Sequence, residues 1–325
     1  MMDYSNFTGD KHMPRRPDAE LVKTSKFREL EFYIMQKRHE SVIYADIQID
    51  LTNTFKFLEK YNKDKKDDEK LTLFQIFLTA AVRTITLRPK VNRFVSGRRL
   101  WQRNRIILSF VVNKEKTEAS EEINAMIEFD PFDTLETVQS IVNKRIYEAR
   151  HEENPNQKDV DFWGGMPRWI IRFMFWFMRW TDEHNIPVNS LIDDMPLWCS
   201  CFIAHLGSLG VDAVFHHPFE LGTASILMII GKIHKAAIVN QETDEIEVRK
   251  VMKLKGSIDD RIASGIYTGP TFDLFKSLIE NPEPLLKPPE LTDEQLDSLK
   301  LKKYKKERVA REKQKKKDKK KRKKK

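Results

Sequence analysis

Two adjacent histidines, His216 and His217, stand directly before Pro218. Because imidazole changes its charge near neutral pH, such a pair could supply a general base or a proton shuttle. The alternative is that both are solvated turn residues or hydrogen-bonded fillers. The histidine and cysteine positions lack the short paired spacings of a zinc site, so we expect no metal.

Two carboxylates, Asp259 and Asp260, lie next to each other before Arg261. A carboxylate can take a proton from a thiol only if burial raises its pKa well above the usual value of about 3.9. His205 is another possible base. It follows Ala204 in a strand-like run, so the two side chains should point to opposite faces of a sheet.

The elements that must position these residues alternate along the chain without an internal repeat, which is typical of one α/β domain. A period of two, or a short buried apolar run, predicts strands at residues 41–51, 91–95, 106–112, 123–129, 198–203, 224–230 and 245–258. Helical spacing predicts helices at residues 26–40, 52–62, 71–86, 131–151, 166–180 and 270–279. Cys199 and Cys201 alternate in a predicted strand and should share one face, as free thiols of a reducing cytoplasm.

Composition divides the chain into a globular part and a tail. Residues 300–325 contain 18 Lys and Arg against 3 Asp and Glu, a net charge of +15, which leaves 40 basic and 46 acidic residues, a net charge of −6, in residues 1–299. We expect an irregular arm at 1–24, a domain at 25–286 and a detachable charged tail at 287–325 that is helical or disordered. No segment resembles a signal peptide or a membrane-spanning helix.

Four phrases in this order resemble the catalytic domain of the dihydrolipoyl acyltransferases, the core subunits of 2-oxoacid dehydrogenase complexes. They are RPKVN at 88–92, FIAHLGSLG at 202–210, ASILMIIG at 224–231, and SIDDRIASG at 257–265 with LIENP at 278–282. The resemblance implies a chloramphenicol-acetyltransferase-like two-layer sandwich, with a mixed sheet and helices. It also implies coenzyme A or an acyl-CoA as substrate, a homotrimer, and no lipoyl attachment in this chain.

The family's catalytic positions are all substituted in this sequence. Its base histidine falls on Asp260, its aspartate on Ser264, and its oxyanion-binding serine on Ala204. Asp259, Arg261 and Gly265 keep the framework of the motif. With the three groups lost together, His205, His216 and His217 are the available substitutes as proton acceptors.

The segment at 166–180 has two interpretations. It is either a helix packed on the sheet or a helix lying in a membrane interface, since aromatic residues and arginines occupy different faces. Its acidic neighbours and short length favour the packed helix.

The resemblance therefore predicts an acyltransferase-family protein that binds acyl-CoA or a related thioester, with altered or lost acyl transfer, and that could meet an acyl-carrying partner protein. The alternative is a non-catalytic trimeric scaffold. In that case residues 300–325 would bind a polyanion such as RNA or anionic lipid by charge.

Overall fold

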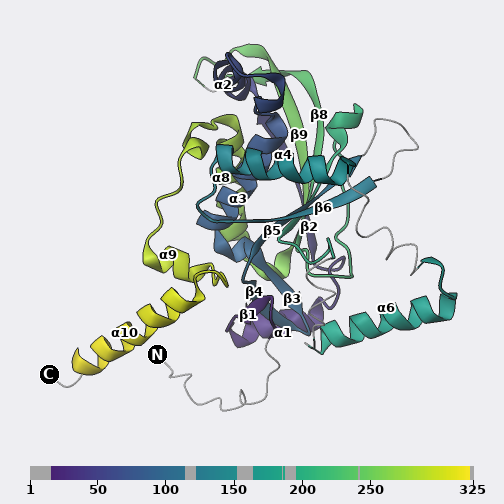
Figure 1. Ribbon diagram of the computed structural model, residues 1–325, viewed down its shortest axis with the longest axis vertical. Coiled ribbons are helices and arrows are strands. Elements are labelled where there is room, and N and C mark those ends of the chain that lie inside the picture. The colour runs from purple at the N-terminus through teal and green to yellow at the C-terminus, as the bar shows by residue number, and fades with distance from the viewer. Residues whose placement is uncertain are drawn as a thin grey trace.

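The computed structural model describes residues 16–113, 122–151, 164–184, 186, 195–240 and 242–322. Its centre is a six-stranded mixed sheet (Figure 1). In spatial order its strands are β2 (Val42–Asp50), β9 (Ile246–Asp259), β8 (Ile226–Val239), β7 (Cys201–His205), β5 (Ile106–Asn113) and β6 (Glu122–Phe129). β7 runs parallel to both of its neighbours, and every other pairing is antiparallel. The predicted mixed sheet is confirmed.

Helices cover one face of this sheet. They are α2 (Thr52–Asn62), α3 (Leu73–Leu87), α4 (Leu135–His151) and α8 (Gly265–Glu280). A capping box of Thr72 and Gln75 starts α3, which is buried along most of its length and joins the helices to the sheet in one core. α8 begins five residues before the predicted start, with Pro270 inside it. As the sixth residue of α8, this proline has no N–H to donate to the Ile266 carbonyl oxygen, so the helix lacks one backbone hydrogen bond in its second turn.

A second, three-stranded sheet consists of β1 (Ala19–Leu21), β4 (Arg99–Arg103) and β3 (Arg93–Ser96), paired in that order. α1 (Lys26–Ile34) packs against it through Phe32, which contacts Val95 and Leu100. The irregular arm predicted at 1–24 is therefore wrong at residues 19–21, because a three-residue strand is too short to show a period in sequence. Residues 1–15 of that arm lie outside the described residues.

The strand predicted at 198–203 begins only at Cys201, and the two cysteines do not share a face. Cys201 belongs to the core beneath the helices, whereas Cys199 packs with Phe202 and Leu227 on the other side of the sheet. Cys199 lies before the strand starts, so strand alternation does not apply to it. Both thiols are free and buried.

The charged tail is partly integrated into the domain. After the short helix α9 (Asp293–Ser298), Leu299 and Leu301 enter the main core, and α10 (Lys305–Arg322) follows. Tyr304 donates a hydrogen bond to Asp130, which tethers the start of α10. The tail is therefore not detachable at residue 287 or 300. Residues 323–325 lie outside the described residues.

The remaining helix, α6 (Arg168–Glu183), projects from the lower end of the body (Figure 1). Only Met178 and Thr181 are buried along it. The interpretation of this segment as a helix packed on the sheet is therefore wrong. Short 3-10 helices complete the fold at Asp67–Glu69, Pro89–Asn92, Leu206–Leu209, Asp260–Ile262 and Glu283–Leu286.

Candidate functional site

A buried ion pair closes the end of β9. Asp259 and Arg261 form a bidentate pair, with Nε–Oδ1 and Nη2–Oδ2 distances of 2.8 and 2.7 Å. The Ser41 hydroxyl donates to Asp259 at 3.0 Å, and Arg261 donates through Nη1 to the carbonyl oxygens of Met35 and Gln36. These contacts fasten the turn after β9 to the segment that follows α1. Within this chain Asp259 and Arg261 are thus structural residues.

Asp260 lies in the next position, with its backbone held and its side chain free. Its amide donates to the Ser41 carbonyl oxygen at 2.9 Å, and its own carbonyl accepts from Arg28 at 3.1 Å. The residue is half-buried. Among the described residues its carboxylate has no hydrogen-bond or ion-pair partner. A fixed backbone thus presents a carboxylate that nothing in the described part of the chain neutralises.

Ser264 and Gly265 start α8 at the surface. Ser264 is at the N-cap position, but its hydroxyl makes no capping hydrogen bond; its carbonyl accepts from the Tyr267 and Thr268 amides. A side chain added at Gly265 would meet nothing within 4 Å. Packing inside this chain therefore requires neither residue type.

Ala204 and His205 lie on opposite faces of β7, as the alternation predicts. Ala204 packs with the cluster on the face away from the helices. The His205 ring stacks on Phe74 of α3, with centroids 5.4 Å apart and planes within 7°. Burial lowers the pKa of His205, which favours its neutral form. His205 thus belongs to the helix-facing core and lies away from the Ala204 face.

The sheet register keeps Ala204 and Asp260 apart within one chain. Ala204 pairs with Ile229, and Ile229 pairs with Lys255, five residues before Asp260. At about 3.3 Å per residue, this offset alone corresponds to roughly 16 Å. The two positions that the sequence assigned to one site are therefore not brought together by this chain alone.

The His216–His217 turn lies over β9. Ser257 donates from its hydroxyl to the His216 carbonyl oxygen. Both imidazoles are exposed and hydrogen-bond locally through Nδ1, His216 to the carbonyl of His217 and His217 to that of Pro218. This arrangement fits the interpretation as solvated turn residues, although the turn sits only three residues from Asp260 along β9.

Two glycines from different sequence phrases meet at this end of the sheet. A side chain at Gly207 would collide with the backbone of Gly231, and one at Gly231 would collide with Ala213. Glycine is therefore needed at both positions to let the turn after β7 lie against β8.

A polar pocket of about 310 Å³ adjoins Arg261 and was not predicted from the sequence. It is lined by Phe32, Gln36, Lys37, Arg38, Val95, Ser96, Gly97, Arg98, Asp182, Glu183, His184, Glu220 and Arg261. Arg38 is a buried cation of this pocket; burial lowers the arginine's pKa, and its Nε has no partner within the described residues. No local pattern marks Arg38, because its partners at Phe219, Glu220 and Gly222 are about 180 residues away.

Most of the acidic groups at this pocket are already paired. Asp182 contacts Arg16 at 2.9 Å, and Glu220 contacts His39 at 2.6 Å. Among the lining residues, four cations (Lys37, Arg38, Arg98 and Arg261) stand against three carboxylates (Asp182, Glu183 and Glu220), a formal excess of one positive charge with histidine neutral. A pocket of this character can take a phosphate-bearing ligand.

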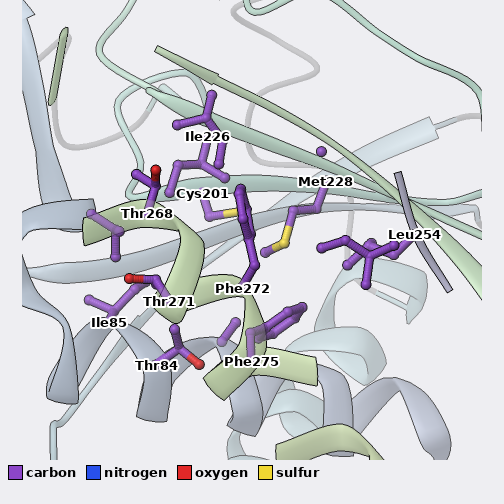
Figure 2. A pocket seen from close by; sticks show the side chains of 15 residues that line it. Thr84, Ile85, Cys201, Ile226, Met228, Leu254, Thr268, Thr271, Phe272 and Phe275 are labelled. Carbon is purple, nitrogen blue, oxygen red and sulfur yellow. The ribbon is translucent and has the colours of Figure 1, made fainter. Parts of the chain in front are cut away.

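A second cavity, of about 50 Å³, lies between the sheet and helices α3 and α8 (Figure 2). Its walls are apolar apart from threonines such as Thr84, Thr268 and Thr271. It contains none of the site residues discussed above. A space this small holds at most a few atoms, so we assign it no role.

Within the described residues, no group of three or more His, Cys, Asp and Glu side chains is placed to hold a metal ion. In the same part of the chain, no helix is both long and apolar enough to cross a membrane.

Comparison with known proteins identifies the family. The family model described as 2-oxoacid dehydrogenases acyltransferase (catalytic domain) matches residues 16–117 and 199–287, which is more than half of the chain. No curated protein matches the sequence.

Solved structures share the fold. Dihydrolipoamide acetyltransferase of Azotobacter vinelandii superposes with a TM-score of 0.55 at 13% identity, covering 88% of this chain and 99% of that one. The cubic core of a pyruvate dehydrogenase multienzyme complex gives a TM-score of 0.54 at 14% identity, covering 82% and 94%. A probable dihydrolipoamide acetyltransferase of Listeria monocytogenes gives 0.51 at 14%, covering 80% and 94%. The acyltransferase fold predicted from the sequence is confirmed.

Proposed function

We propose that this chain, which belongs to the 2-oxoacid dehydrogenase acyltransferase (catalytic domain) family, binds coenzyme A thioesters in the cytoplasm without the usual histidine-dependent acyl transfer. Asp260 is the observation that carries the proposal. An ordinary aspartate carboxyl has a pKa of about 3.9 and a thiol about 8.5, so a carboxylate is a poor acceptor for a thiol proton. No partner among the described residues acts on this carboxylate.

The Ala204 methyl group supports the same proposal. Attack of a thiol on a thioester builds negative charge on the carbonyl oxygen, and a donor placed there can be worth about 2.7–4 kcal/mol. A methyl group donates nothing. Because the base and the oxyanion donor act on the same transition state, losing both removes catalysis without requiring loss of binding.

The polar pocket beside Arg261 supports binding of a phosphate-bearing ligand. Lys37 and Arg98 are exposed cations among its lining residues, and Arg38 adds a buried one. Coenzyme A carries several phosphate charges, which suit such a set. We therefore propose that Lys37 and Arg98 contact the phosphates of the bound nucleotide.

Calorimetry with coenzyme A and acetyl-CoA tests this proposal directly. We expect binding without acetyl transfer to dihydrolipoamide. The Lys37→Ala/Arg98→Ala variant should bind roughly tenfold more weakly if each contact contributes about 0.5–1 kcal/mol. A control pair of exposed lysines, Lys60→Ala/Lys63→Ala on and after α2, should leave affinity unchanged. If the protein binds no CoA ester at all, the proposal fails.

We further propose a homotrimer in which a second subunit completes the site. The offset of roughly 16 Å between Ala204 and Asp260 supports this, since one chain cannot present both to the same thioester. An exposed apolar set around the turns could form such a contact; it comprises Leu209, Val211, Val214, Phe215 and Ile266.

The alternative, a non-catalytic scaffold with a polyanion-binding tail, is favoured by the basic helix α10 alone. Its test must cut the chain after Arg311, because Leu299 and Leu301 belong to the core. If removing residues 312–325 abolishes RNA binding while CoA binding is absent in both forms, the scaffold becomes the better proposal.

A further inference from the structure

The outward face of α6 is an aromatic stripe that this chain leaves exposed. Trp169, Phe173 and Trp176 are 71%, 60% and 57% exposed. Trp180 continues the stripe, at spacings of three and four that place all four rings on one side of the helix. Neighbouring rings contact each other at centroid distances of 5.8 Å (Phe173–Trp176, tilted) and 6.5 Å (Trp176–Trp180, stacked). From Phe173 to Trp180 the stripe is therefore continuous.

The inward face alone attaches α6 to the body. Met174 and Met178 pack with Trp198 and Leu221. At the end of the helix, Asp182 pairs with Arg16 at 2.9 Å. The stripe takes no part in these contacts, so packing within the described part of the chain does not require aromatic residues there.

Three arginines border the stripe. At about 100° per residue, Arg168, Arg172 and Arg179 lie roughly a quarter turn from the aromatic rings. None of the three has an ion-pair partner within the described ranges. Aromatic rings beside unpaired arginines are the composition of a helix lying at the boundary between lipid acyl chains and headgroups.

The second observation is the basic helix α10, which the small sheet holds at the same end of the molecule. Arg308 of α10 pairs with Glu20 of β1. At the end of α6, the Ser96 hydroxyl of β3 donates to the Asp182 carbonyl oxygen at 2.9 Å. Figure 1 shows both helices leaving the lower end of the body, where β1, β3 and β4 lie. The most basic stretch of the sequence and the aromatic helix thus leave the same end of the molecule, in opposite directions.

We propose that α6 and α10 form a membrane-binding face for anionic phospholipid bilayers. The aromatic stripe of α6 enters the interface, its arginines contact lipid phosphates, and the lysines of α10 are attracted by the surface charge. Stable peripheral binding needs two such signals, because either one alone is weak and reversible. Charge favours a bilayer over a second copy of this chain. The net charge of +15 in residues 300–325 exceeds the −6 that residues 1–299 of a second copy would offer, whereas an anionic bilayer accepts all these cations.

The test uses the full chain in flotation with vesicles of phosphatidylcholine containing phosphatidylglycerol, and with phosphatidylcholine alone. We expect flotation only with phosphatidylglycerol, and a blue shift of tryptophan emission on binding. Substitution of the stripe (Trp169→Ser/Phe173→Ser/Trp176→Ser) should weaken binding at least tenfold. Changing α10 lysines (Lys313→Gln/Lys315→Gln/Lys316→Gln/Lys317→Gln) should also weaken it at least tenfold.

A matched control removes exposed apolar side chains elsewhere. Ile246 and Val248 are 74% and 73% exposed on β9, and Ile246→Ser/Val248→Ser should bind vesicles like the native chain. Circular dichroism and CoA binding, measured on every variant, separate a loss of folding from a loss of lipid binding. The proposal does not depend on CoA binding.

Three results would overturn the proposal. One is the absence of flotation with anionic vesicles. Another is loss of binding in the lysine variant but not in the stripe variant, which would show charge attraction alone. The third is a native oligomer that dissociates in the stripe variant, measured by sedimentation, which would show that a second copy covers the stripe.

Discussion

At the scale of single residues, Asp259 and Asp260 have the same side chain and opposite surroundings. Asp259 is buried and bound on both oxygens by Arg261, while the Asp260 carboxylate has no partner among the described residues. Removing one partner of a buried pair leaves the other charge desolvated, whereas a half-buried carboxylate without a partner is replaced at little cost. Of these two neighbouring residues, only Asp259 has a structural role within the described part of the chain.

We predict that Asp259→Asn lowers the free energy of unfolding by about 3–5 kcal/mol, because Arg261 loses its counter-charge. The adjacent Asp260→Asn serves as the control and should change it by less than about 0.5 kcal/mol. Urea denaturation followed by circular dichroism measures both. Equal losses of stability in the two variants would mean that the Asp259–Arg261 ion pair does not stabilise the turn after β9.

Restoring the family's groups should reveal how much chemistry the fold still supports. Asp260→His alone should give little acetyl transfer to dihydrolipoamide, since no donor meets the oxyanion. Adding Ala204→Ser should increase the rate by a further factor of about 10²–10³. Asp260→Asn/Ala204→Ser, which carries the donor without the base, is the control. A rate that Ala204→Ser leaves unchanged would show that Ala204 does not face the thioester.

His205 predicts a pH dependence of stability. Burial lowers its pKa from the usual 6.5, so the unfolded chain binds the proton more readily. Stability contributed by neutral His205 is therefore full above about pH 6.5 and falls as the pH drops toward the folded pKa. His205→Leu should flatten the stability profile between about pH 7 and 5. A profile unchanged by His205→Leu contradicts this assignment.

At the scale of elements, Leu299 and Leu301 anchor the tail in the main core, and their contribution to the free energy of unfolding can be measured. Leu299 is fully buried, so Leu299→Ala should lower the free energy of unfolding by roughly 2–5 kcal/mol. Within the described residues, truncation after Arg311 removes no residue of the core and only one ion pair, between Lys300 and Glu312, so it should change the melting temperature little. If both changes are neutral, the tail does not contribute to the core.

The sequence predicted where helices and strands lie better than it predicted which distant residues they contact. The period of residues 166–180 showed a helix, but it could not show that only one side is covered, because burial depends on residues such as Trp198 and Leu221 from another segment. The motif at 257–265 could be recognised from the sequence. Its separation from Ala204 could not, because it depends on how β7, β8 and β9 are aligned in the sheet. Arg38 was missed for the same reason, since its buried contacts are formed by distant backbone carbonyls.

At the scale of the whole molecule, exposed apolar residues near the candidate site predict a self-association that the chain alone does not display. Ile266 at the start of α8 is 91% exposed. We expect sedimentation at a mass close to three times 38.4 kDa. Ile266→Asp should shift the distribution toward monomer, because burial of a new carboxylate at a contact is costly. Val239→Asp on β8 is the control, and a monomeric native protein would exclude the trimer.

The two cysteines lie on opposite faces of the sheet, so the alkylation rate of each thiol reports how often its own side of the sheet opens. Burial raises the pKa of Cys199 to about 12 and that of Cys201 well above its usual value, so neither presents a thiolate to an alkylating reagent in the folded state. Alkylation must then wait for an opening of the layer that covers each sulfur. Cys201 would record openings of the helical layer, and Cys199 those of the turns on the other face. Pulsed alkylation with mass spectrometry could therefore measure separately the opening rates of the helical layer and of the turns on the other face of the sheet.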